Sequence, residues 1–359
     1  MCSAFVGGYD QRVKDTAIVP QLDVEHARGR DLVWCASFDL AWRALCDAVG
    51  GPIALKPDPT GGAEYDRALS FVRALNASLV REDVALPNWC VALAGEHTEE
   101  WVERAQELLR ARQAETTLFP GTPNPGLLVA YAYADVHLPF ETPFASVQGG
   151  MHFKGTAVHG FGVWDPYNDA ERALYEARVR QVLIHHHRFA FEYDPDDLHE
   201  DDGPSEEFVI ELETSQKDSR VIVACCVPER TFAGTVALTM SRLRDDAASQ
   251  PDARLRSEEK LRVPSLDFDA TRRHPELHGR GILNRGFEAH IFGETLERVC
   301  FVLDEGGARV VSEALFGGLS LPPRSFVCTD PFLVMVMRRG ARMPFLAAWV
   351  ETAELLRKR

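Results

Sequence analysis

Residues 297–349 read ERVCFVLDEGGARVVSEALFGGLSLPPRSFVCTDPFLVMVMRRGARMPFLAAW, and this stretch decides the fold. It carries two apolar runs of strand length, residues 299–303 and 332–337, in which every side chain is hydrophobic. Continuous rather than alternating hydrophobicity is typical of strands that are buried on both faces. We therefore expect both runs to be buried strands.

Residues 304–331 connect the two runs and fit neither a helix nor a paired strand. A connection of this length without structure of its own is uncommon in a compact domain, and it is usually functional or disordered. Its apolar content argues against a disordered linker. The apolar residues are Val310, Val311, Leu315, Phe316, Leu319 and Leu321. The sequence therefore predicts a presented surface loop.

Three motifs follow one another along this stretch. Residues 304–307 read Asp-Glu-Gly-Gly, residues 319–323 read Leu-Ser-Leu-Pro-Pro, and residues 330–333 read Asp-Pro-Phe-Leu. Their order and spacing resemble the serpins, the serine-protease-inhibitor superfamily. In that family a buried strand ends in a Glu-x-Gly hinge, continues as an exposed reactive-centre loop, and returns through Pro-Pro to two further buried strands that carry a Pro-Phe.

Two patches further upstream extend the resemblance. Residues 262–269, followed by Gly281-Ile282 and Phe287, are similar to the family's Pro-Lys-Phe strand and the Leu-Gly-Ile before the hinge strand. Residues 127–144 are similar to its central strand, which ends in Trp-x-x-Pro-Phe. The patches cover roughly the C-terminal two-thirds of the chain, and their collinear order is the evidence. The family's Ser-Pro-x-Ser-Ile motif is absent, and there is no room before Leu127 for its long helix across the main sheet.

The resemblance implies a mixed α+β fold. We expect a serpin-like single domain over residues 1–359, with a large central β-sheet, additional sheets, peripheral helices and an exposed loop of the reactive-centre type. The family likeness also implies a monomer with a metastable fold. The first 30 residues are polar and show no clear period, so they are predicted to form a loosely held N-terminal arm.

The resemblance also implies a function without catalytic residues or a cofactor. In the family, a protease cuts the exposed loop, the loop inserts into the main sheet as an extra strand, and the attached protease is distorted. By this likeness the chain is a suicide-substrate inhibitor of a serine or cysteine protease that uses residues 305–323. The bond attacked is the one between Leu319 and Ser320, and a leucine at this position suits a protease with an apolar primary pocket.

The composition of the hinge bears on this function. Glu305, Gly307 and Ala308 are the expected hinge residues, and the small side chains of the latter two suit entry into a closing sheet. Residues 309–311, Arg-Val-Val, and Glu313 suit insertion less well. Two alternatives therefore stay open. One is a non-inhibitory serpin-fold binding protein whose loop or clefts engage a partner, and the other is an enzyme with a dispersed active site.

The composition argues against several other classes of function. The chain has 359 residues, of which 45% are hydrophobic, so it can bury a large core. Its formal net charge of -15 argues against partners such as nucleic acid or an anionic membrane. Neither an apolar stretch of membrane-spanning length nor a secretory signal is visible. We expect a soluble, cytoplasmic protein, with secretion left open.

The cysteines and histidines offer the remaining candidate sites. The eight cysteines include no C-x-x-C pair, which favours a reducing compartment, and Cys225, Cys226 and Cys300 lie in apolar runs where thiols are expected to be buried. His185-His186-His187 is the most conspicuous cluster, because His185 and His187 would share one face of a regular strand. A structural metal needs more ligands than these two, so we expect no metal there.

Hydrophobic periodicity predicts the other elements. Helices are expected over residues 38–45, 65–75, 99–109, 170–180 and 232–243, with Ser37 capping the first and Thr98 starting the third. Residues 208–212 and 221–227 are predicted to form a hairpin, and residues 151–164 and 182–193 to contribute strands.

Overall fold

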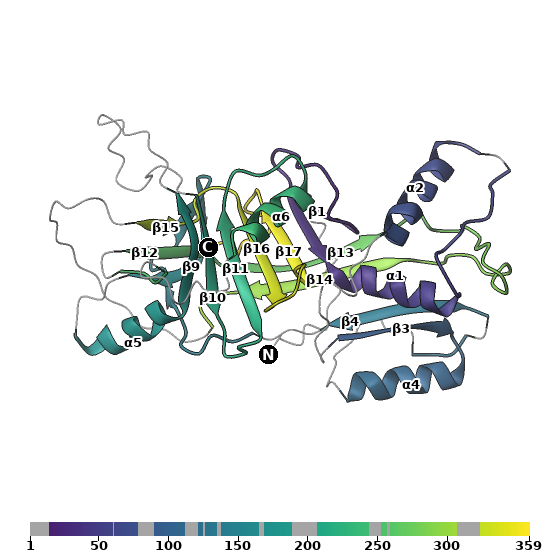
Figure 1. The fold of residues 1–359 in the computed structure, drawn as a ribbon, viewed down its shortest axis with the longest axis horizontal. Helices are drawn as coiled ribbons and strands as arrows, with labels where there is room; N and C mark the ends of the chain where they lie inside the picture. Colours follow the sequence, from purple (N-terminus) through teal and green to yellow (C-terminus); the bar gives the residue numbers. More distant parts are fainter. Residues whose placement is uncertain are drawn as a thin grey trace.

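The computed structural model shows a mixed α+β protein that is elongated, with a strand-rich part and a part that contains α1, α2 and α4 (Figure 1). It describes residues 14–59, 61–77, 90–111, 121–124, 126–134, 138–164, 169–188, 207–243, 253–256, 259–306 and 324–359. Within these ranges no helix is long and apolar enough to cross a membrane.

A seven-stranded sheet forms the core of the strand-rich part, with the order β1-β2-β17-β16-β11-β10-β9. Its strands are β1 (Thr16–Ile18), β2 (Asp31–Cys35), β9 (Val182–Arg188), β10 (Glu207–Glu213), β11 (Ser219–Cys225), β16 (Phe332–Arg338) and β17 (Leu346–Val350). β10 and β11 form the predicted antiparallel hairpin. In β16 every residue from Phe332 to Met337 is buried, which confirms that this run is a strand covered on both faces.

A four-stranded sheet, with the order β15-β12-β8-β5, lies beside this core. Its strands are β5 (Ala145–Ser146), β8 (Gly160–Val163), β12 (Lys260–Pro264) and β15 (Ser325–Val327). A small hairpin of β6 (Met151–Phe153) and β7 (Thr156–Val158) precedes β8, so the predicted strands over residues 151–164 are present. Gly162 is required here, because a Cβ on it would lie 1.8 Å from the carbonyl oxygen of Leu261.

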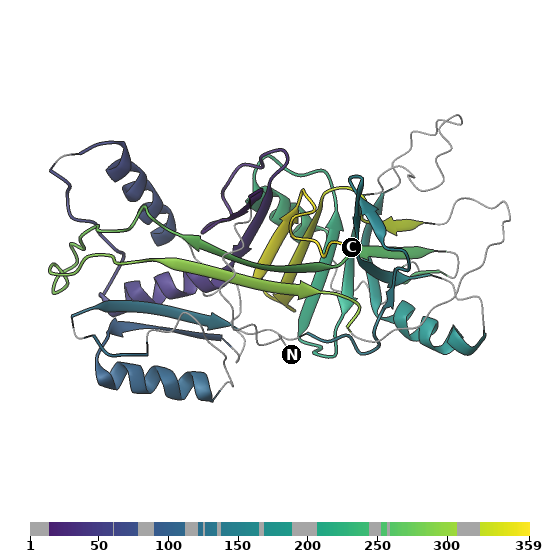
Figure 2. The same cartoon turned by 180° about the vertical axis from the view of Figure 1, so that it is seen from behind.

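Two separate antiparallel pairs extend from the core towards the helices (Figure 2). β3 (Cys90–Glu96) pairs with β4 (Leu128–Ala134), and β13 (Leu266–Arg273) pairs with β14 (Leu296–Leu303). The prediction that residues 299–303 are buried on both faces is wrong. Cys300 is exposed and Val302 is 51% exposed, because β14 belongs to a two-stranded sheet whose outer face is uncovered.

The helices confirm most of the periodic predictions. They are α1 (Ala36–Ala48), α2 (Ala63–Ala77), α4 (Glu99–Arg110), α5 (Asp169–Arg180) and α6 (Phe232–Ser241). The side chain of Thr98 accepts a hydrogen bond from the backbone N–H of Trp101 and caps α4 as expected. The predicted cap at Ser37 is wrong, because α1 follows β2 directly and begins two residues earlier than predicted, with Cys35 at the cap position.

The described part of the N-terminal segment is held in place, which corrects the prediction of a loose arm over residues 1–30. β1 pairs in parallel with β2, and the backbone N–H groups of Lys14 and Asp15 donate to the Glu354 carboxylate near the C-terminus. Asp31 ties the same ends together, because its carboxylate accepts from the backbone N–H groups of Glu351 and Thr352 at 2.7 and 2.6 Å. Residues 1–13 of the expected arm lie outside the described residues.

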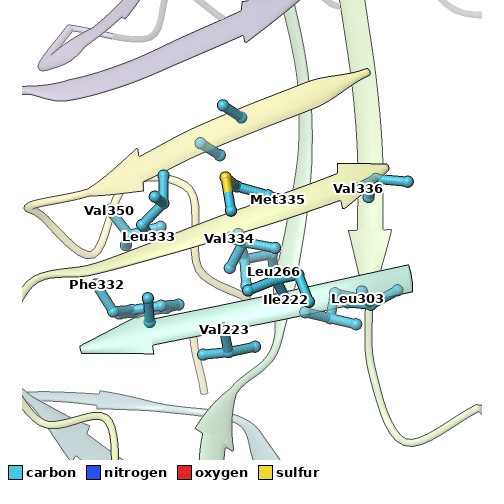
Figure 3. Packing of buried hydrophobic residues seen from close by; sticks show 14 of the residues in the cluster. Ile222, Val223, Leu266, Leu303, Phe332, Leu333, Val334, Met335, Val336 and Val350 are labelled. Atoms are coloured by element: carbon cyan, nitrogen blue, oxygen red, sulfur yellow. The ribbon is translucent and has the colours of Figure 1, made fainter. Parts of the chain in front are cut away.

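The end of β14 is anchored in the main core. Leu303, its last residue, is paired with Leu266, the first residue of β13, and both are buried. Figure 3 shows these two side chains next to Ile222 of β11 and Val334 of β16. The end of the β13–β14 pair therefore packs against the seven-stranded sheet, close to where the long connection begins.

Candidate functional site

The start of the long connection is fixed by contacts with a distant segment. After β14 ends, the backbone carbonyl of Glu305 accepts a hydrogen bond from the N–H of Phe144 at 3.0 Å, and its carboxylate accepts one from the Ser146 hydroxyl at 2.7 Å. Gly306 has φ +76°, a left-handed conformation that favours glycine, and its N–H donates to the Asp304 carboxylate at 2.8 Å. The chain thus turns away from β14 at Gly306.

These contacts bring together two sequence patches that had been recognised separately. Phe140 and Phe144 belong to the Pro-Phe patch of residues 140–144, and their rings meet edge to face with centroids 4.7 Å apart. A Cβ on Gly306 would lie 3.6 Å from the Phe140 ring. The residues that follow β14 therefore pack against the patch that follows β4, a contact that no local sequence pattern predicts.

The end of the connection is fixed in a different sheet. Arg324 precedes β15, is buried, and forms an ion pair with Glu259, in which Nη2 donates to Oε2 at 2.9 Å. Its Nη2 also donates to the backbone carbonyl of Arg254 at 3.3 Å, and its guanidinium lies 5.5 Å from the centre of the Phe326 ring. We call this group the Arg324 clamp. Sequence reasoning missed it, because nothing links two residues that are 65 positions apart.

The structure places only part of the expected site. Glu305 is the one predicted hinge residue within the described ranges, and it is half-buried. Gly307, Ala308, Leu319 and Ser320 lie outside the described residues. What the structure does fix is both ends of residues 307–323: one at the end of β14, the other at the Arg324 clamp in the four-stranded sheet.

Between the β3–β4 pair and the β13–β14 pair, the described residues form no hydrogen-bonded ladder. α1 contacts both pairs. Leu128 and Ala130 of β4 pack against the cluster that contains Phe38 and Trp42 of α1, and the Phe38 ring lies 4.3 Å from the ring of His274, which follows β13. One helix thus supports two sheets that are not joined to each other.

A buried polar cluster lies at this support. Asp39 of α1, His274 and Glu297 of β14 are all buried, and His274 Nε2 is 3.5 Å from Glu297 Oε2. Among the residues that the structure describes, neither oxygen of Glu297 has a hydrogen-bond donor. Asp39 accepts a hydrogen bond from Trp34 Nε1 at 3.1 Å.

The environment of this cluster favours neutral side chains. Burial, together with the nearby Asp39 carboxylate, raises the pKa of Glu297 well above its ordinary value, although the Arg272 guanidinium opposes the shift. Burial and the charge of Arg272 lower the pKa of His274 to about 3. Both shifts favour the uncharged form, the carboxylic acid of Glu297 and the neutral imidazole of His274. Sequence reasoning did not identify these residues, since each stands alone within an otherwise ordinary element.

The histidine run has a different geometry from the one predicted. The β9–β10 register shifts between Val209, which pairs with His186, and Ile210, which pairs with Ile184, so the bulge lies at His185. His185 Nε2 lies 3.0 Å from the buried carboxylate of Glu211, whereas His187 faces the Phe326 ring on the Phe208 side of the sheet. The expectation that His185 and His187 share a face is therefore wrong, because the bulge reverses the alternation.

Near His185, the Glu211 carboxylate also interacts with two arginine side chains. Arg339 donates to it at 2.5 Å, and Arg220 Nε lies 3.6 Å away. Burial raises the pKa of Glu211, but the His185 hydrogen bond and the two guanidinium groups outweigh this and leave the pKa below its ordinary value. Within the described ranges, no three His, Cys, Asp or Glu side chains are placed to hold a metal ion. The cluster is an ion-pair network inside the seven-stranded sheet.

No family model and no curated protein matches the chain. Among solved structures, a serpin from the trematode Schistosoma haematobium is similar over 90% of this chain and 94% of its own, with 12% identity and a TM-score of 0.46. Human thyroxine-binding globulin complexed with thyroxine is similar over 92% of this chain and 93% of its own, with 10% identity and a TM-score of 0.43. Native protease nexin-1 with heparin has 10% identity and a TM-score of 0.43 over 90% of this chain and 92% of its own. In fold, the chain is similar to the serpins, and its collinear sequence motifs resemble those of a divergent member of that family.

Proposed function

We propose that the chain presents residues 307–323 to a protease as a substrate-like loop and acts as a suicide-substrate inhibitor, with the bond between Leu319 and Ser320 as the point of attack. One observation carries the proposal. The chain leaves the end of β14 at Glu305, which Phe144 and Ser146 hold, and re-enters the core at the Arg324 clamp in another sheet. A segment tethered at both ends to a rigid scaffold can be offered to a protease without loss of the fold.

The arrangement of the sheets supports the step that follows cleavage, in which the cut loop inserts as an extra strand. β4 and β14 belong to separate two-stranded sheets that share the support of α1. The edge strands of both pairs carry backbone groups that an added strand can satisfy. Because the loop follows β14 in the chain, we expect it to enter beside that strand once a cut frees it.

The experiment is to incubate the chain with a serine protease that has an apolar primary pocket, and to analyse the products on a denaturing gel. We expect cleavage after Leu319 and a complex of chain and protease that survives denaturation. A matched variant, Leu319→Arg, is expected to lose this complex and to form one with a protease that cuts after basic residues. Clean cleavage without any stable complex would favour the alternative of a non-inhibitory binding protein.

A further inference from the structure

Cys225 and Cys328 form a contact between two sheets that the proposed function does not use. Cys225 is the last residue of β11 in the seven-stranded sheet, and Cys328 directly follows β15 of the four-stranded sheet. Their Sγ atoms are 3.1 Å apart, and both side chains are buried within the main hydrophobic cluster. Cys328 also continues the pairing of β15, because its N–H donates to the carbonyl of Arg262 at 3.0 Å.

The surroundings of this pair do not activate either thiol for catalysis. A reactive thiol needs a cation, a base or a helix N-terminus that stabilises its thiolate. Here burial, the hydrogen bond with Cys328 and the nearby Asp330 carboxylate raise the pKa of Cys225 well above its ordinary value. Such a pair is inert as a catalyst, but its sulfur atoms need to approach by only about 1 Å to reach the bonded distance of a disulfide.

The neighbouring thiol is placed away from the pair. Cys226 follows Cys225 in the chain, is half-buried, and hydrogen-bonds with Thr239 of α6. Burial raises its pKa to about 11. Consecutive residues of an extended chain point to opposite sides. Cys226 therefore points away from Cys328 and serves as a control for disulfide formation by Cys225.

We propose that Cys225 and Cys328 are a disulfide-forming site, which a small disulfide oxidant of the glutathione class closes to join the seven-stranded and four-stranded sheets covalently. Cys328 adjoins β15, the edge strand of its sheet, whereas β11 lies between β10 and β16, so Cys328 is the first to be exposed by local opening. Its thiolate attacks the oxidant and releases one thiol. The Cys225 thiolate then attacks the mixed disulfide and releases the second. The two cysteines lose two electrons and two protons, and the oxidant is reduced to two thiols.

The new bond would fix the segment through which the chain returns to the core after residues 307–323. It would fix the residue after β15, three residues beyond Ser325, to the end of β11, an inner strand of the seven-stranded sheet. In the unfolded chain it would close a loop of about 100 residues, and loops of this size give large stabilisation by a disulfide. The inference stands independently of protease inhibition, because it needs only the contact between the two sheets.

The test is to equilibrate the full chain in buffers with increasing ratios of oxidised to reduced glutathione, and to map its disulfides by mass spectrometry after trapping the free thiols. We expect a single linkage, between Cys225 and Cys328, and a rise of roughly 5–10 °C in Tm for the oxidised protein. The variant Cys226→Ala should show the same linkage and the same rise. Cys225→Ala and Cys328→Ala should show neither.

Mapping of the unmodified chain does not depend on whether the variants fold. The proposal is overturned if Cys225 and Cys328 both remain free at the most oxidising ratio. It is also overturned if either cysteine carries only a bound glutathione, or is linked to another cysteine. In each of these cases the 3.1 Å contact would be a packing contact between two thiols and nothing more.

Discussion

At the scale of single residues, the buried side chains of Asp39, His274 and Glu297 make the stability of one junction depend on pH. Each lies where α1 meets the end of the β13–β14 pair, and each would be costly to bury as an isolated charge. The pKa of Glu297 is raised and that of His274 is lowered, so in the fold both shifts favour the uncharged form. The stability of this junction must therefore depend on pH.

The sign of that dependence follows from counting protons. The pKa of Glu297 is higher in the folded chain than its ordinary value of 4.5, so the stability that Glu297 contributes is fully present below about pH 4.5 and is lost as pH rises towards the folded pKa. Between about pH 4.5 and 6.5 His274 opposes this loss, because the unfolded chain releases its imidazole proton there while the folded imidazole is already neutral. Below about pH 4.5 the unfolded chain holds two protons and the folded chain one, so stability falls as pH drops towards about 3.

We therefore expect Glu297→Gln to remove the loss of stability on the alkaline side. Glutamine has the shape of the neutral carboxylic acid but no proton to lose. The measurement is the midpoint of urea unfolding from pH 4 to 9 for the wild type and the variant. The wild-type free energy of unfolding should fall relative to that of the variant by at most about 1.4 kcal/mol per pH unit from about pH 4.5 upwards, the ordinary pKa of a glutamate. Two parallel curves would contradict the assigned protonation state.

Asn76 provides a second prediction at this scale. Its side chain accepts hydrogen bonds from Trp42 Nε1 at 3.1 Å and from the Ile53 N–H at 3.2 Å, and donates to the Ile53 carbonyl at 2.8 Å, so it connects α1, α2 and the segment between them. Asn76→Ala should lower the free energy of unfolding by about 2–3 kcal/mol, because it leaves partly buried groups without partners.

Asn284 is the matched control for that substitution. It makes the same kind of contact with the same segment, accepting from the Ala54 N–H at 2.9 Å and donating to the Pro52 carbonyl at 3.0 Å, but at the surface. Water can replace these bonds, so Asn284→Ala should cost less than about 1 kcal/mol. Equal losses for the two variants, measured by urea unfolding, would show that burial of the Asn76 contacts has no effect.

At the scale of elements, the sequence predicts helices and strands that follow from a local pattern. It fails where the structure depends on which other element packs against or pairs with the segment. The 3.6-residue period located α2, α4, α5 and α6, and the continuous apolar run located β16. The equally apolar run at Val299–Leu303 forms a strand, but no element covers its outer face, and the run itself cannot reveal that. The bulge at His185 arises from the register with β10, so a pattern read along β9 alone gave the wrong face.

The Arg324 clamp makes a prediction about one element, β15. Arg324→Met would remove the guanidinium partner of the buried Glu259 carboxylate, while the Arg256 N–H would still donate to it at 2.8 Å. We therefore expect a loss of about 3–5 kcal/mol in the free energy of unfolding. The double variant Arg324→Met, Glu259→Gln should recover much of this loss, because no charge stays buried. Hydrogen exchange at the backbone of β15 should speed up in the single variant more than in the double one. Equal exchange in both would show that the clamp does not hold β15.

At the scale of the whole molecule, patches that are distant in the sequence meet in space. Glu305, just after β14, is hydrogen-bonded to Phe144 and Ser146, and the residue after β15 contacts the end of β11. Collinear motifs predicted that these segments exist and in what order, but not which of them touch, because contact depends on how the sheets stack. For the same reason the separate β3–β4 and β13–β14 pairs became visible only in three dimensions.

The separation of these pairs allows a decisive prediction about the molecule as a whole. If a cut between Leu319 and Ser320 frees the loop to become a strand beside β14, its backbone groups gain partners, each worth a net 0.5–1.5 kcal/mol or about 1 kcal/mol on average. Summed over a strand, this should raise the Tm of the cleaved protein by roughly 10–20 °C. If the loop stays outside, the cut only releases a tethered end, and the Tm should hardly change. Thermal unfolding of the intact and singly cleaved chain, followed by circular dichroism, separates the two outcomes.

Two variants of the loop sharpen this comparison. Ala308→Arg places a long charged side chain where the hinge must enter first, so it should abolish the rise in Tm without preventing the cut. Glu313→Ala removes a carboxylate whose burial in the sheet is unfavourable, so it should leave the rise intact or increase it. An unchanged Tm in the cleaved wild type, together with a rise in cleaved Glu313→Ala, would identify that carboxylate as the block to insertion. No rise in any of the three proteins would contradict a metastable fold and leave the chain as a binding protein of the same architecture.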